Sequence, residues 1–229
     1  MINKSSYFSF IVLTISFLTS CIGDDFVFDE VEPMVVITSN LQTLALGTTF
    51  QIEAKYLDNV GAEQVLPKNW TSSASDIISV DQSGLITALN AGQSVITAEL
   101  ILDDMILEDQ ITVTVAEETT QSSNARTGVI ESTSSYRLEG NFSLEKVGEN
   151  LVLDIDETYQ TTSALPGLYI YLTNNRNSNS GALEIGEVTV FSGAHSYTLP
   201  DDVGINDYQY LLYYCKPFSV KVGDGQFEN

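Results

Sequence analysis

The residue types that carry most enzyme and cofactor chemistry are scarce in this chain. Its 229 residues include two cysteines, one histidine and one tryptophan. Cys21 and Cys215 lie far apart, so there is no Cys-x-x-Cys redox pair and no Cys-x-x-Cys-His motif for covalent haem attachment. The groupings of a catalytic triad, a metal site or a phosphate-binding loop are also missing. The cysteines are left as the candidates for chemistry.

Basic residues are few as well. Nine Lys and Arg stand against 31 Asp and Glu, which gives a net charge of −22. Nucleic-acid binding depends on clustered Lys and Arg, so nucleic acid is excluded as a partner. No loop has the spacing of a calcium site, and the acidic surface is interpreted as favouring solubility.

Helical periodicity is nearly absent. Short runs rich in Val, Ile, Thr, Tyr and Phe alternate apolar and polar residues between turn residues, which is typical of strands. The chain is long enough for two domains. We expect an all-β protein with two tandem β-sandwich-like domains behind an N-terminal signal segment.

That signal segment is Met1–Ser20. One basic residue, Lys4, precedes an apolar core from about Tyr7 to Leu18. This core is shorter than the roughly 20 residues of a membrane-spanning helix, so a removed signal peptide is favoured over a permanent anchor.

Leu18-Thr19-Ser20-Cys21 resembles the lipobox of bacterial lipoproteins, in which a peptidase cuts before the cysteine and the thiol carries a diacylglycerol. The resemblance implies a lipid on Cys21, and two or more acyl chains hold a protein stably on a membrane. The mature chain would keep 31 acidic and 8 basic residues, because only Lys4 is lost. The alternative is an ordinary secretory signal, with Cys21 free or in a disulfide with Cys215.

Residues 21–34 form an acidic stretch that we interpret as a tether. It resembles the export signal that sends lipoproteins of the Bacteroidetes to the outer face of the outer membrane. A solvated, unfolded tether explains the same charges, and the two interpretations are compatible. Together they predict a lipid-anchored protein of the outer membrane, exposed at the cell surface.

Residues 35–116 are expected to be the first domain. Four features resemble the group 2 bacterial Ig-like domain: Leu46-Gly47 before a strand, Trp70 followed by Ser72-Ser73, the segment Val80–Ala88, and Gly92 before a strand. Trp70 is interpreted as a core residue between two sheets. The resemblance implies presentation, adhesion or binding of a partner.

Residues 117–126 are polar and small, which indicates a flexible linker. Residues 127–229 follow as a second β domain, in which the polar loop Asn174–Ser180 cannot contribute to a core. The strands expected there are Tyr136–Lys146, Leu151–Ile155, Leu168–Leu172, Glu184–Val188, Ser196–Leu199, Tyr208–Cys215 and Ser219–Val222.

The second domain resembles the DM-thirteen domain, through Leu138–Leu144, Leu165–Leu172, Ser196–Pro200 and Tyr214–Gly223. The resemblance implies electron transfer through a nearly invariant cysteine, used as a bare thiol or as a ligand to a group such as haem. Cys215 is the matching cysteine. Tyr214 stands where the family often has Trp, and the ending Gly223–Phe227 is more polar than usual.

Around Cys215 the residues themselves favour burial. On a strand, Leu211, Tyr213 and Cys215 share one face, while Lys216 points to the other and cannot promote a thiolate. His195 is the one candidate for a second ligand, but its segment Ser192–His195 is interpreted as an exposed turn.

Two hypotheses remain open. In the first, the Ig-like domain lifts a redox domain off the membrane, and Cys215 exchanges electrons directly or through a cofactor whose identity is unknown. In the second, both domains bind a protein or glycan partner and Cys215 is a structural thiol.

Overall fold

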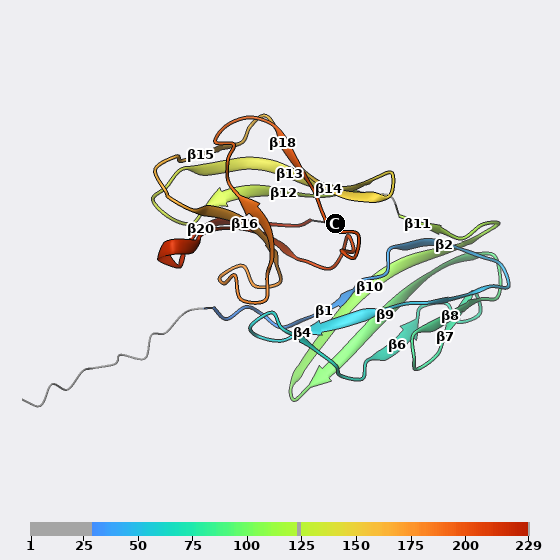
Figure 1. Cartoon of the computed structure of the whole chain (residues 1–229). Coiled ribbons are helices and arrows are strands. Elements are labelled where there is room, and N and C mark those ends of the chain that lie inside the picture. Colours follow the sequence, from blue (N-terminus) through green and yellow to red (C-terminus); the bar gives the residue numbers. More distant parts are fainter. Residues whose placement is uncertain (1–28, 123–124, 229) are drawn as a thin grey trace, which may run out of the picture.

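The computed structural model describes residues 29–122 and 125–228, and it is all-β, as expected (Figure 1). Within these residues the one helical element is a single 3-10 turn, Lys216–Phe218. No helix of the described part is long and apolar enough to cross a membrane. The predicted signal peptide Met1–Ser20 and Cys21 lie outside the described residues.

The first unit contains eleven strands, all before residue 122. Sheets join β1-β4-β5, β11-β2-β10-β9-β6 and β3-β8-β7. The strands are β1 (Met34–Ile37), β2 (Leu41–Ala45), β3 (Thr49–Gln51), β4 (Ala54–Leu57), β5 (Glu63–Gln64), β6 (Asn69–Ser72), β7 (Ile78–Val80), β8 (Leu85–Ala88), β9 (Gly92–Leu102), β10 (Met105–Ala116) and β11 (Thr120–Gln121).

The core of this unit follows from strand alternation. In β9 every second residue from Ser94 to Leu100 is buried, because successive side chains of a strand point to opposite faces. Ile96, Ala98 and Leu100 of β9 pack in one core cluster with Leu44 and Val113 from other strands and with Ile52 from the segment after β3. Trp70 packs against the same core from β6 and is partly buried, in agreement with its interpretation as a core residue.

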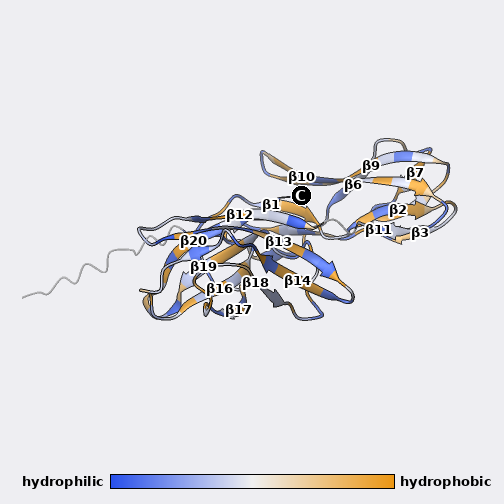
Figure 2. Ribbon diagram, turned by 90° about the horizontal axis from the view of Figure 1, so that it is seen from above, coloured by the Kyte–Doolittle hydropathy of each residue, from blue (hydrophilic) through white to orange (hydrophobic). Residues whose placement is uncertain are grey.

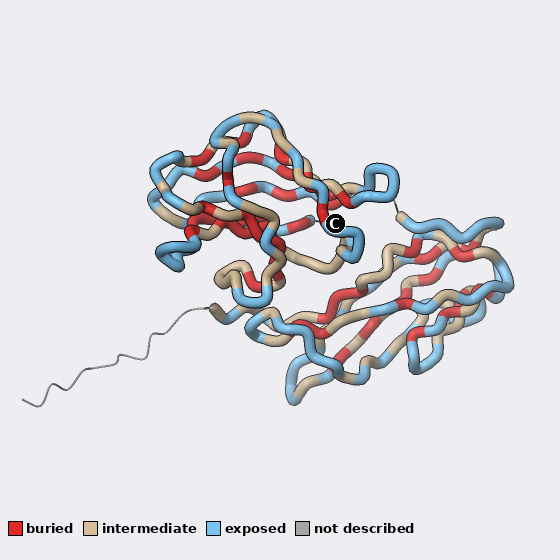
Figure 3. Tube along the Cα trace, in the orientation of Figure 1, coloured by how far each residue is buried: buried red, intermediate tan, exposed pale blue. Residues whose placement is uncertain are grey.

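The second unit is one long curved sheet with the order β17-β16-β19-β20-β12-β13-β14-β18, with β15 paired to β13. Its strands are β12 (Arg126–Ser132), β13 (Leu138–Val147), β14 (Asn150–Ile155), β15 (Gln160–Thr161), β16 (Leu168–Thr173), β17 (Leu183–Glu187), β18 (His195–Thr198), β19 (Tyr210–Cys215) and β20 (Val220–Gln226). Leu172 from one end of the sheet and Leu153 from the other lie in a single core cluster. The sheet therefore curls around one core. In the tube view, buried residues occur along its strands between exposed and intermediate ones (Figure 3).

One strand of this sheet, β12, was not expected from the sequence. Its inward residues are Arg126, Gly128 and Ile130, so the alternation contains a charged residue and a glycine where apolar residues are normally found. Phe142 from β13 fills the space that the glycine leaves. Its ring also meets Phe227 edge-on, with ring centroids 5.0 Å apart.

Arg126 fixes the start of β12. Its guanidinium is buried and donates hydrogen bonds to the carbonyl oxygens of Ile205 (3.3 Å), Tyr208 (2.8 Å) and Phe227 (3.4 Å), and to Oε1 of Gln209 (3.1 Å). Burial lowers the pKa of Arg126 to about 10, so the side chain is still a cation at neutral pH. One cation thus ties three segments of the domain together.

The segment expected to be a flexible linker is partly a strand. Thr120–Gln121 pairs with β2, and the hydroxyls of Thr43 and Thr120 lie 2.7 Å apart. Arg126, its last residue, is buried in the second unit. Both ends of the segment are therefore attached to a domain.

The two units lie side by side (Figure 2), and polar side chains connect them. Lys55 forms an ion pair with Asp207 at 3.1 Å. Asn175, at 3 % exposed, donates to the carbonyl oxygens of Val60 (3.0 Å) and Asp29. Asn177 donates to the carbonyl of Glu30 at 3.1 Å. The polar loop Asn174–Ser180 is thus a contact surface between the domains, which the sequence did not indicate.

Replacing Gly225 by alanine tests the packing of the curved sheet. A Cβ there would meet Cε1 of Phe142 at 2.5 Å and the carbonyl oxygen of Val129 at 2.6 Å. We expect Gly225→Ala to lower the free energy of unfolding by about 1–3 kcal/mol, because the core has no room for the methyl group. Adding Phe142→Leu should recover part of this loss in denaturant melts. If the loss of unfolding free energy in the double variant equals the sum of the losses in the two single variants, the proposed clash is contradicted.

Asn175→Ala tests the contact between the domains. The variant leaves the carbonyl of Val60 without its donor, so we expect the free energy of unfolding to fall by about 1–3 kcal/mol. Amide exchange should also become faster around residue 60. Asn150→Ala, at an exposed hairpin position, is the matched control and should change neither quantity. Equal effects of the two substitutions would show that the contact is not formed.

Candidate functional site

Cys215 is the last residue of β19 and lies in the core of the second unit, 1 % exposed. Its Sγ donates to the carbonyl oxygen of Pro166 at 3.4 Å. Because a carbonyl oxygen can only accept, this hydrogen bond requires the protonated thiol. The geometry thus favours a neutral thiol over a reactive thiolate.

The local sequence explains how the thiol is held. Pro217 lies in the 3-10 turn that follows β19, and the left-handed Ser219 ends this turn before β20. The turn that contains Gly167 packs closely against Pro217. A Cβ on Gly167 would lie only 2.8 Å from the Pro217 ring. Leu211 and Tyr213 lie in the same core cluster as Cys215, as the strand alternation predicts.

Lys216 lies on the outer side. Its Nζ donates to Oε2 of Glu184 at 2.8 Å and sits 4.7 Å from the ring centroid of Tyr169. These contacts hold the ammonium of Lys216 against Glu184 and Tyr169. They agree with the prediction that it does not stabilise a thiolate at Cys215.

The prediction for His195 is wrong. His195 begins β18, pairs with Ile155, and is partly buried instead of lying in an exposed turn. Its Nδ1 is 2.9 Å from the carbonyl oxygen of Gly193, so Nδ1 carries a proton and donates it. In the neutral ring Nε2 is then a base, and it is buried without a hydrogen-bond partner in the described residues.

Two buried tyrosines accompany the histidine. The ring of Tyr159 lies edge-on to His195 with centroids 4.8 Å apart, and stacks on Tyr213 at 6.0 Å. Both tyrosines are fully buried, and neither hydroxyl has a hydrogen-bond partner of good geometry within the described residues. Burial raises the pKa of Tyr159 to about 12 and that of Tyr213 well above its usual range, so both stay protonated at neutral pH.

Tyr159 could not be recognised as a site residue from the sequence. It follows β14 in the loop that leads to β15, and nothing in its neighbours marks it as buried. The position of Tyr159 is set by a contact with a distant segment. The N–H of Gly193, in the 191–193 loop, donates a hydrogen bond to the Tyr159 carbonyl oxygen at 3.0 Å.

Haem does not fit the surroundings of Cys215 in this structure. An axial sulfur ligand needs open space, whereas this Sγ is packed in the core and bonded to Pro166. Five cavities of about 350 to 650 Å³ in the described residues are lined by residues other than Cys215. No group of three or more His, Cys, Asp or Glu in the described residues could hold a metal ion.

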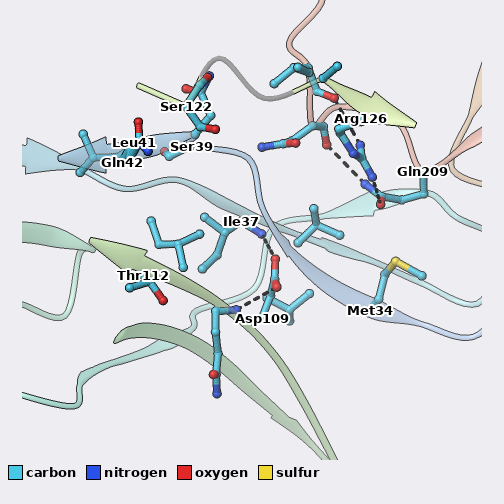
Figure 4. Close-up of a pocket in the computed structure, with 18 residues that line it drawn as sticks. Met34, Ile37, Ser39, Leu41, Gln42, Asp109, Thr112, Ser122, Arg126 and Gln209 are labelled. Atoms are coloured by element: carbon cyan, nitrogen blue, oxygen red, sulfur yellow. Dashed lines mark hydrogen bonds between the residues drawn. The ribbon is translucent and has the colours of Figure 1, made fainter. Parts of the chain in front are cut away.

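The best-formed cavity, of about 570 Å³, lies between the two units (Figure 4). Arg126 and Gln209 line one side, and Asp109 the other. These groups already have protein partners: Asp109 accepts from the Ile37 N–H at 2.7 Å, and Arg126 donates to Gln209. We assign the cavity a structural role at the domain boundary.

The second unit is thus an all-β domain that encloses one thiol and a buried aromatic cluster. Residues 130–227 match a protein-family model described as "Electron transfer DM13", and this range includes Cys215. The chain therefore contains a DM13 domain over most of its second unit. No curated protein matches the chain.

Tyr213→Phe tests whether the hydroxyl lacks a partner. Removing an unsatisfied buried hydroxyl should leave the free energy of unfolding unchanged or raise it by about 1 kcal/mol. Tyr171→Phe is the control, because its hydroxyl donates to Glu184 at 3.1 Å, and it should lower the value by about 1 kcal/mol. A clear loss of stability in Tyr213→Phe would reveal a hydrogen bond that this geometry does not contain.

Proposed function

We propose that the protein is a membrane-anchored, surface-exposed electron-transfer lipoprotein whose DM13 domain uses Cys215 as its redox group. The observation that carries the proposal is the DM13 match, in which Cys215 is the one cysteine of the described residues. Its complete burial protects the sulfur from the solvent and from unspecific thiol exchange.

Burial also restricts how electrons reach the sulfur. A partner cannot contact Sγ while Pro166 and the 3-10 turn cover it, so either these segments open or electrons pass through the surrounding side chains. An enzyme-like role with a bound substrate is not required by either route.

The anchor is proposed to be the lipid on Cys21, with residues 21–34 as the tether and the first domain as an Ig-like presenting unit. The polar contacts through Asn175 and Lys55 support a fixed orientation of the DM13 domain against the first unit. The proposed location is the outer membrane, at the cell surface.

A second candidate function is adhesion or binding of a protein or glycan, with Cys215 as a structural thiol. The observation that favours it is the hydrogen bond that Sγ donates to the carbonyl oxygen of Pro166 within an apolar core. A free cysteine in such a place behaves as a small apolar residue.

Thiol counting and redox titration of protein purified from its native membrane test the proposal. With the chain folded, we expect no alkylation of Cys215, because Sγ is 1 % exposed. After unfolding we expect one reactive thiol if Cys21 carries the lipid, and two if it does not. Titration with a one-electron oxidant should remove at least one more electron from the wild type than from Cys215→Ala.

Cys215→Val serves as a second variant, because it keeps an apolar side chain of similar volume if alanine leaves a cavity. Equal electron counts for the wild type and both folded variants would refute the redox role and favour the binding function. A loss of partner binding that accompanies the loss of the sulfur would in turn exclude a purely structural thiol.

A further inference from the structure

Buried polar atoms without partners gather at one place in this molecule. Among the described residues four such side-chain atoms occur: Nε of Arg126, the hydroxyls of Tyr159 and Tyr213, and Nε2 of His195. The last three belong to side chains in direct ring contact. Buried polar groups are normally paired, so three unpaired ones in a single cluster call for an explanation beyond packing.

The cluster forms a continuous row from the thiol toward the surface. Tyr213 lies two residues before Cys215 on the same face of β19, which is about 7 Å along a strand. Ring contacts then lead from Tyr213 to Tyr159, to His195 and, at 5.5 Å, to Tyr197, which is partly exposed. Aromatic side chains thus connect the buried sulfur with the protein surface.

The row contains both proton donors, the two phenols, and a proton acceptor, His195. Both phenols are protonated at neutral pH, because burial raises the pKa of each, and their rings stack with centroids 6.0 Å apart. In the neutral ring, Nε2 of His195 is the nitrogen without a proton, because Nδ1 donates to the carbonyl oxygen of Gly193. A buried phenol loses an electron readily only if its proton leaves at the same time, since a cationic phenol is costly in an apolar core. His195 offers the nearby base.

We propose that Tyr159 and Tyr213 form a one-electron relay between Cys215 and the surface, with His195 Nε2 as the proton acceptor. This proposal rests on the electron-transfer function argued above. It adds Tyr159 and Tyr213 to that function, and it gives His195 the role of a base instead of that of a ligand.

The steps balance as follows. Tyr159 gives one electron to a one-electron oxidant outside the domain, such as a high-potential metal centre of a partner, and its hydroxyl proton goes to His195 Nε2. Tyr213 then transfers a hydrogen atom to the Tyr159 oxygen, which restores the phenol. Cys215 restores Tyr213 by giving up one electron and the thiol proton, so that one electron has left the sulfur and one proton rests on His195.

Light-driven oxidation of the full chain tests the relay. A ruthenium tris-bipyridyl sensitiser with a cobalt(III) quencher supplies the oxidant, and electron paramagnetic resonance detects tyrosyl radicals. We expect a tyrosyl signal in the wild type and at least a tenfold lower yield in Tyr159→Phe. His195→Phe, which keeps an aromatic ring without the base, should lower the yield at least fivefold.

Tyr171→Phe is the matched control, since Tyr171 is also buried but lies outside the core cluster that contains Cys215. Its radical yield should stay within twofold of the wild type. Tyr213→Phe and Cys215→Ala should both prolong the life of the Tyr159 radical at least threefold, because the electron that refills it can no longer come from the sulfur. Thermal melts confirm that each variant is folded.

The outcomes separate this relay from the function on which it rests. A wild type without a tyrosyl signal, or a Tyr159→Phe yield equal to that of Tyr171→Phe, overturns the relay. If the tyrosine and histidine variants behave as expected but Cys215→Ala does not change the radical lifetime, only the proton-coupled oxidation of Tyr159 stands, and the relay from Cys215 is overturned. If Cys215 adds an electron in the titration while Tyr159→Phe changes nothing, the redox function stands and the relay falls.

Discussion

The buried guanidinium of Arg126 is the interaction on which the second domain depends. It carries a charge inside the protein and distributes its donors over carbonyl groups from the 205–209 segment and from the end of β20. These segments flank β19, so the same cation positions the strand that carries Tyr213 and Cys215. Removing one partner of such an arrangement leaves a buried group unsatisfied, which makes Arg126 a structural residue and not an anion site.

Much of the fold could be predicted from the sequence, because most strands bury alternate apolar residues. The all-β class and nearly all strands of the second domain follow from that pattern. β12 could not be predicted, because its inward positions hold Arg126 and Gly128. Their fit depends on Phe142 and on carbonyl groups far along the chain. The contact of Asn175 with the first unit could not be predicted for a related reason. The sequence of a polar loop is the same whether its side chains bond to water or to the backbone of another domain.

The candidate site was predictable only in part. Cys215 and its inward orientation follow from the alternation of β19, and its burial confirms that orientation. The histidine was assigned to an exposed turn because its neighbours are small and polar. Its actual position is set by pairing with Ile155 and by the ring of Tyr159, contacts between residues distant in sequence. The chemistry of this domain therefore resides in tertiary contacts that local patterns do not encode.

The contacts of Asp29 and Glu30 with the loop of Asn175 and Asn177 have a consequence for the orientation of the protein on a membrane. The described chain begins beside the second domain, although it continues into the first. If Cys21 carries a lipid, seven residues lie between it and Asp29, and the eight steps along the chain span at most about 29 Å. The side of the DM13 domain that contacts Asp29 and Glu30 would then lie close to the bilayer, within reach of a partner in the same membrane.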